Sequence, residues 1–224
     1  KDSYYYFRSI WNKEKITLHL LPHWNWKGQE GEFMQVVAYT NCDEVILYIN
    51  GRKVGRRSYT CPNYGSVKAW NDRRKIRPTT HDLHLCWDVP YEPGELKAVG
   101  YKDGEIVAET VVKTTGKPVA LKAVADRETV AVDGVVHIDI STIDENGLHV
   151  PDATPIIHCE VEGPAHLVGM DSGDLTDHTL YSSPDRKMFS GFLMAMVYAD
   201  APGDIRVKFS SESMKDVIVD IKAK

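Results

Sequence analysis

Apolar and polar residues alternate at every second position through much of this chain. The pattern begins at residues 16–20, where Ile16, Leu18 and Leu20 alternate with polar neighbours. It returns at 136–140 and 205–209 in the second half. A period of two is that of a β-strand with one buried face. The chain is therefore predicted to be all-β over most of its length.

Turn signals divide these runs into short strands. Asn50-Gly51 separates two strand-like runs, and Asp103-Gly104 separates two more. Asn, Asp and Gly tolerate the positive φ that a two-residue hairpin turn requires. About seven strands in the first half, at this spacing, predict an immunoglobulin-like β-sandwich.

The second half predicts another sandwich of the same architecture. Residues 114–118, Thr-Thr-Gly-Lys-Pro, have the composition of a linker. We therefore place one domain at 15–116 and a second at 117–224. Each needs its own two-layer core to bury its apolar faces.

Only the first residues follow a helical period. Tyr4, Phe7 and Trp11 recur at steps of three and four, which places them on one helix face. Residues 1–14 are thus expected to form a helical stub, cut from a longer protein, whose aromatic face packs on something outside this sequence.

The composition argues against two classes of function, nucleic-acid binding and membrane spanning. The 224 residues are 42% hydrophobic and carry a net charge of −5. A nucleic-acid partner is not expected, because such proteins need a basic excess against phosphate. No apolar run approaches the roughly 20 residues of a membrane span.

The four cysteines show neither CxxC pairs nor metal-ligand spacing. Cys159 stands alone in the second half, so a disulfide would have to join two of Cys42, Cys61 and Cys86. Buried thiols are the favoured interpretation, and a Cys61–Cys86 disulfide is the alternative.

Several sequence segments resemble the non-catalytic C-terminal domains of bacterial family 2 glycoside hydrolases of the β-galactosidase type. They include His23-Trp-Asn-Trp26 and the run from Leu47 to Gly55 in the first half. Asp144-Glu-Asn-Gly147 and Gly169-Met-Asp-Ser-Gly-Asp174 resemble the family's final domain. The helical stub resembles the last helix of the family's catalytic (β/α)₈ barrel.

This resemblance implies an accessory role. The family's two catalytic glutamates belong to the barrel, and no glutamate here lies in a matching motif, so we assign no catalytic residue, metal or cofactor. The implied partner is the catalytic barrel of the parent chain, which would hydrolyse β-galactosides. A periplasmic or cell-surface location in a bacterium is expected from the resemblance alone.

The segment His23, Trp24, Asn25 and Trp26 is the candidate carbohydrate-binding site. If the segment is extended, residues two apart face the same side, and both indoles could stack on the apolar face of a sugar. His23 and Asn25 could then bind hydroxyl groups. The favoured alternative is that the rings fill the end of the sandwich or pack on the barrel.

The remaining candidates are weaker. Asp171, Asp174 and Asp177 are oxygen donors at three-residue steps, but they do not match a Ca²⁺ loop and are favoured as turn residues. His81 and His84 would point to opposite faces of a strand, which makes them poor joint ligands. A long aperiodic excursion between Ser58 and Asp82 contains Trp70 and the basic run Arg73–Arg77, which is favoured as a solvated loop.

Two other functions stay open from the sequence. One is a stand-alone carbohydrate-binding or adhesin-type module, which predicts glycan binding that is lost when Trp24 or Trp26 is replaced. The other is a spacer, which predicts no glycan binding. The orphan aromatic face of the stub favours the accessory role over both.

Overall fold

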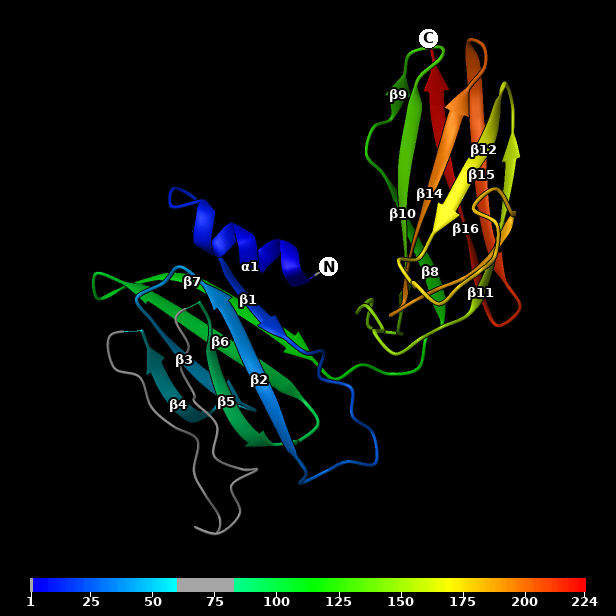
Figure 1. The fold of residues 1–224 in the computed structure, drawn as a ribbon. Helices are drawn as coiled ribbons and strands as arrows, with labels where there is room; N and C mark the ends of the chain where they lie inside the picture. Colours follow the sequence, from blue (N-terminus) through cyan, green and yellow to red (C-terminus); the bar gives the residue numbers. More distant parts are fainter. Residues whose placement is uncertain (1, 60–82) are drawn as a thin grey trace. The chain divides into compact units, whose positions relative to one another are not determined.

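The computed structural model describes residues 2–59 and 83–224 and divides the chain into two compact units, Lys1–Thr114 and Thr115–Lys224. Figure 1 shows a short helix with strands in the first unit and strands throughout the second. Among the described residues, no helix is long and apolar enough to cross a membrane.

The described part of the first unit contains one helix and two antiparallel sheets. Strands β1, β2 and β5 form one sheet, and β4, β3, β6 and β7 form the other. The elements are α1 (Asp2–Trp11), β1 (Leu18–Leu21), β2 (Phe33–Thr40), β3 (Glu44–Ile49), β4 (Arg52–Ser58), β5 (Leu85–Pro90), β6 (Glu95–Lys102) and β7 (Glu105–Lys113).

Both predicted hairpin turns of this unit are confirmed. Asn50 and Gly51 connect β3 to β4 with φ of 49° and 77°, and Asp103 and Gly104 connect β6 to β7 with 53° and 84°. The strands on either side of each turn pair antiparallel, each pair with one register shift along its length. The positive φ values explain why Asn, Asp and Gly occupy these positions.

The first turn is also tied to the loop between β5 and β6. The Asn50 carboxamide accepts a hydrogen bond from the Glu95 amide at 2.8 Å and donates one to the Pro93 carbonyl at 3.1 Å. Gly94 lies against it with φ of 132°, and a Cβ there would be 2.1 Å from Asn50 Oδ1. A glycine is therefore required at position 94.

Alternate residues of the facing strands form the core of the first unit. In β3 every second side chain is buried, namely Val45, Leu47 and Ile49. Trp87 of β5 lies among the largest fully buried side chains of the chain. The pattern of burial is thus the period of two that the sequence shows.

The second unit is built from nine strands that hydrogen bonding links into one sheet. The sheet order runs β12-β14-β10-β8 and continues β16-β15-β11-β13, with β9 beside β16. Its strands are β8 (Ala120–Ala125), β9 (Thr129–Val130), β10 (Val135–Ile143), β11 (Ile156–Glu162), β12 (Ala165–Asp171), β13 (Asp185–Lys187), β14 (Phe192–Ala199), β15 (Gly203–Ser211) and β16 (Met214–Ala223).

A single parallel pairing, Lys215 with Ala120, joins the two halves of this order. The apolar side chains of both halves form one buried cluster that includes Ile138, Val207 and Phe209. The prediction of an all-β fold with tandem sandwiches behind a short helix is confirmed. Strands β9, β12 and β13 were not predicted, because none has a sustained alternating pattern.

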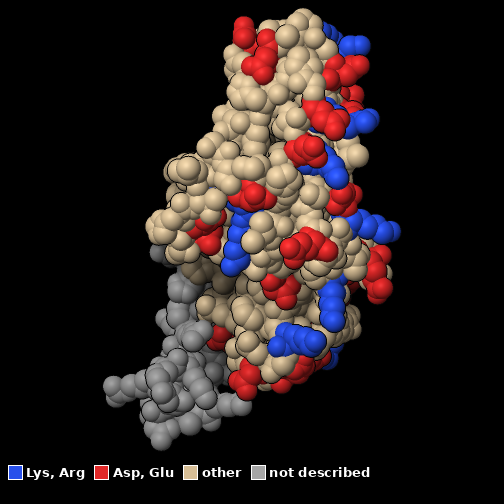
Figure 2. Space-filling model, turned by 90° about the vertical axis from the view of Figure 1, so that its right-hand side faces the viewer, with Lys and Arg blue, Asp and Glu red and all other residues tan. Residues whose placement is uncertain are grey.

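Charges of both signs lie on the face of the molecule drawn in Figure 2. On the face drawn in Figure 2, Asp and Glu side chains lie among Lys and Arg side chains, and neither sign gathers into a continuous patch. Such a face offers no track for a phosphate backbone, which requires clustered basic residues.

Candidate functional site

Helix α1 is attached to the first sandwich by one of its faces. Asp2 Oδ1 lies 2.7 Å from His19 Nε2 on β1, and the Tyr5 ring stacks on the same imidazole with centroids 3.8 Å apart. Arg8 Nε donates to Thr17 Oγ1 at 2.9 Å, and the Tyr6 ring meets Tyr39 edge-on at 5.1 Å. These polar and aromatic contacts hold the helix against the edge of the sandwich.

The opposite face of α1 carries three aromatic side chains into solvent. Tyr4 is 59% exposed, Phe7 is 45% exposed and Trp11 is 75% exposed. Phe7 and Trp11 stack on each other with centroids 4.8 Å apart. We call these three residues the aromatic face. A contiguous apolar face on a helix whose other side is anchored is typical of a contact surface.

The structure removes Trp24 from the candidate carbohydrate site and agrees with the favoured alternative, in which the ring packs into the sandwich. Its side chain is fully buried at 0% exposure, its Nε1 donates to the Glu92 carbonyl at 2.9 Å, and its ring meets Tyr91 edge-on at 5.1 Å. The Trp24 carbonyl accepts a hydrogen bond from Thr114 Oγ1 at 2.6 Å. This indole therefore closes the end of the sandwich and offers no face to a sugar.

The segment from 22 to 32 is a loop and not a strand, so the premise of an extended segment is wrong. Trp24 belongs to the buried core cluster of the first unit, and Trp26 packs against that cluster from its rim. Trp26 is only partly buried. Its Nε1 donates to the His23 carbonyl at 3.0 Å, and its ring stacks on the His23 imidazole at 4.7 Å. Asn25 donates its backbone N–H to His23 Nδ1 at 3.2 Å. Carbohydrate binding by His23, Asn25 and Trp26 stays a prediction.

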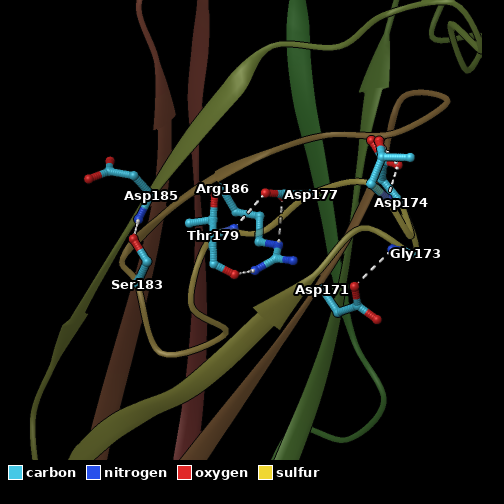
Figure 3. Close-up of polar contacts among 9 residues, drawn as sticks. Asp171, Gly173, Asp174, Asp177, Thr179, Ser183, Asp185 and Arg186 are labelled. Atoms are coloured by element: carbon cyan, nitrogen blue, oxygen red, sulfur yellow. Dashed lines mark hydrogen bonds and ion pairs between the residues drawn. The ribbon is translucent and has the colours of Figure 1, made fainter.

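Asp171, the last residue of β12, and Asp174, in the loop that follows, each accept hydrogen bonds within their own turn (Figure 3). Asp171 accepts from the Gly173 amide at 2.9 Å, and Asp174 accepts from the amide and hydroxyl of Thr176 at 2.9 and 2.8 Å. The bonds from Thr176 lower the pKa of Asp174. Within the described ranges, no group of three or more His, Cys, Asp or Glu side chains is placed to hold a metal ion.

The buried side chain of Arg186 contacts this loop. This residue was not singled out from the sequence. Its side chain is 1% exposed, its Nη1 donates to the Thr179 carbonyl at 2.8 Å, and its Nε lies 3.3 Å from Asp177 Oδ2. The guanidinium also lies 4.8 Å from the centroid of the Tyr181 ring. Arg186 is the middle residue of the charged run Asp-Arg-Lys at 185–187. Three charged residues in a row predict exposure, so the sequence does not indicate that Arg186 is buried.

The cysteines fit the interpretation as buried thiols where the structure describes them. Cys42 and Cys159 are free and buried, and burial raises the pKa of Cys159 to about 12. Cys61, half of the alternative disulfide, lies outside the described residues, as do His81, Trp70 and the basic run Arg73–Arg77. The ring of His84 meets Tyr39 edge-on at 6.2 Å.

Comparison with known proteins gives matches to both units. Residues 121–220 match the family described as glycoside hydrolase family 2 C-terminal domain 5, and residues 31–108 match a domain of unknown function, DUF4982. A β-galactosidase of Bacteroides ovatus is 31% identical over 227 residues, which cover 100% of this chain and 24% of that protein.

Two further relatives give the same picture. A β-glucuronidase of Formosa agariphila is 29% identical over 169 residues, covering 74% of this chain and 15% of that protein. The solved structure of a β-glycosidase from Bacteroides vulgatus superposes with a TM-score of 0.85 at 30% identity, over 99% of this chain and 26% of that one. The chain spans about a quarter or less of the length of these relatives.

Proposed function

Because this chain belongs to the C-terminal, non-catalytic region of family 2 glycoside hydrolases, we propose that it supports the catalytic domain of a longer hydrolase. The support acts through the aromatic face of α1. The longer protein is proposed to hydrolyse terminal β-galactosides.

The observation that carries this proposal is the exposure of Tyr4, Phe7 and Trp11 on an anchored helix. An aromatic side chain has about 150–250 Å² of surface, so the three exposed fractions together amount to roughly 270–450 Å². At about 25 cal/mol per Å², covering this surface contributes about 7–11 kcal/mol of gross transfer free energy. A packed catalytic domain would supply that cover within the same polypeptide.

The choice of sugar rests on the relatives. The β-galactosidase of Bacteroides ovatus matches the whole of this chain, and that favours a β-galactoside. The β-glucuronidase of Formosa agariphila favours a β-glucuronide as the second candidate. Turnover of 4-nitrophenyl β-galactoside against 4-nitrophenyl β-glucuronide by the longer enzyme separates the two, and preference for the glucuronide would overturn the first.

The docking role is tested by making the aromatic face polar in the longer enzyme. Phe7→Ser with Trp11→Ser should lower the melting temperature and reduce turnover, because the contact loses its apolar anchors. Ile218→Ser is the matched control, since Ile218 is 51% exposed on β16 of the other unit. Equal behaviour of the double variant and the control would contradict the docking role.

The 224-residue chain by itself is expected to give no turnover. Retaining glycosidases need two carboxyl groups about 5 Å apart across the sugar, and no glutamate of this chain lies in a motif that matches the family's catalytic pair. The same preparation tests the binding-module alternative. Glycan binding by the isolated chain that is lost in Trp26→Ala would favour that alternative over a purely supporting role.

A further inference from the structure

An open groove of about 580 Å³ lies at one end of the second unit. Its lining comes from the start of β11, from β13 and from the hairpin between β15 and β16. The residues that line it are Pro155, Ile156, His158, Asp185, Ser210, Ser211, Glu212 and Ser213. Apart from Pro155, whose carbonyl accepts a hydrogen bond from the Met188 amide, these positions lie in paired strands or in a tight hairpin, which gives a small ligand a fixed set of contacts.

The middle of the groove is a row of three polar side chains on neighbouring strands. His158 of β11 is paired with Asp185 of β13 on one side and with Ser210 of β15 on the other. His158 Nδ1 lies 2.8 Å from Asp185 Oδ1. An ionised carboxylate only accepts hydrogen bonds, so Nδ1 is the donor in this contact. The neutral imidazole then keeps Nε2 as an acceptor.

We propose that this groove binds a neutral oligosaccharide. Carboxylate, imidazole and hydroxyl groups together supply acceptors and donors for sugar hydroxyls, and Pro155 with the 64% exposed Ile156 supplies an apolar surface for the C–H groups. The inference rests on the proposed function, because a glycan becomes the relevant ligand class only if the parent acts on carbohydrates.

The charge of the lining selects neutral sugars over uronic acids. Asp185 and Glu212 are the charged members, and none of the residues that line the groove is Lys or Arg. Among the lining residues a sugar carboxylate would meet two like charges and no Lys or Arg side chain, which disfavours its binding. The groove should therefore discriminate against glucuronides whichever substrate the catalytic domain prefers.

The test is a titration of the intact chain followed by ¹H–¹⁵N NMR, with lactose and with methyl β-D-glucuronide as probes. Lactose should cause saturable shifts at the amides of His158, Asp185 and Ser210 with a Kd of roughly 1–10 mM, a weak affinity that suits an open polar groove. The glucuronide should bind at least about tenfold more weakly.

His158→Ala should weaken lactose binding by about tenfold, the value of one lost hydrogen-bonding group. His166→Ala is the matched control, because His166 Nδ1 lies 2.9 Å from Asp200 Oδ2 in another exposed pair outside the groove. No saturable binding up to about 50 mM lactose, equal effects of the two variants, or tighter binding of the glucuronide would each overturn the proposal. Turnover by the longer enzyme is a separate measurement, so failure of the groove is distinguishable from failure of the proposed function.

Discussion

Replacement of Asp144 should destabilise the second unit without affecting the first. The residue is 2% exposed, and its carboxylate accepts three backbone hydrogen bonds. Oδ1 accepts from the amides of Asn146 and Leu148, and Oδ2 accepts from the amide of Gly116, each at 2.9 Å. The carboxylate thereby closes the turn after β10 and fixes the segment that enters β8.

The magnitude follows from the geometry of Asp144→Asn. A carboxamide has one oxygen, which can keep the bonds from Asn146 and Leu148, so its Nδ2 then faces the N–H of Gly116. A hydrogen bond to a charged acceptor contributes about 1.5–3 kcal/mol, and a buried donor left without a partner costs a similar amount. We expect a loss of about 2–3 kcal/mol, and about 3–4 kcal/mol for Asp144→Ala, which leaves all three amides without the carboxylate.

The pH dependence has a definite sign. Burial raises the pKa of Asp144, but the backbone hydrogen bonds from Gly116, Leu148 and Asn146 outweigh it, and the net pKa is lowered. A carboxyl group whose pKa is lower in the folded state stabilises that state above its unfolded pKa of about 3.9. This stabilisation is lost as the pH falls through the folded pKa. The difference in unfolding free energy between the native chain and Asp144→Asn should therefore shrink on acidification.

The distribution of tryptophan supplies an internal control for the assay. All 5 tryptophans lie within residues 1–114, so their fluorescence reports on the first unit, while far-UV circular dichroism reports on both. With a urea m-value of about 1–2 kcal/mol per M, Asp144→Asn should lower the midpoint of the second unit by roughly 1–3 M. The fluorescence midpoint should not move.

Asp139→Asn is the matched control, because Asp139 is an exposed aspartate on β10. It removes the same charge without touching a buried hydrogen bond, so its effect should stay within about 0.5 kcal/mol. If Asp144→Asn unfolds at the same urea concentration as Asp139→Asn at neutral pH, the proposed role of the buried carboxylate is refuted.

Three further outcomes are expected. Gly94→Ala should destabilise the first unit by about 2–4 kcal/mol in fluorescence-monitored unfolding, because its Cβ would meet the carboxamide of the β3–β4 turn; Gly104→Ala, with open space around it, should cost about 1 kcal/mol. Arg186→Met should lower the free energy of unfolding by about 3–5 kcal/mol and speed amide exchange in the loop after β12. Arg206→Met is the control: Arg206 forms an exposed ion pair with Asp220, so its loss should lower the free energy of unfolding by at most about 1 kcal/mol. Cys159, with its raised pKa of about 12, should resist iodoacetamide at pH 8 until the second unit unfolds.

The period of two was enough to predict the sandwiches, because one-sided burial leaves a direct trace in the order of residues. Val45, Leu47 and Ile49 are buried as their spacing requires. The sequence of strand β13 shows no alternation of apolar and polar residues. It has three residues, and its inward member is Arg186, so hydropathy marks it as a loop.

The candidate carbohydrate site was less predictable, because two tryptophans of the same type and spacing differ only in tertiary context. Trp24 is held by Tyr91, Glu92 and Thr114, which are 67, 68 and 90 residues further along the chain. Trp26 bonds and stacks with His23 inside the same loop and packs only partly buried against the core. Local sequence therefore gave no means of telling the core indole from the surface one.

The two faces of α1 explain why a supporting role fits this helix better than a structural role within the unit. Its inner contacts are the Asp2–His19 pair, one arginine hydrogen bond, the Tyr5 ring stacked on His19 and the Tyr6 ring edge-on to Tyr39, and Ser9 is its only buried residue. The polar members of this set contribute little each, because exposed ion pairs and hydrogen bonds are weak. The outer side carries the exposed apolar side chains Tyr4, Phe7 and Trp11. A helix of ten residues is marginal on its own, so we expect α1 to be stabilised further when a second body covers its outer face.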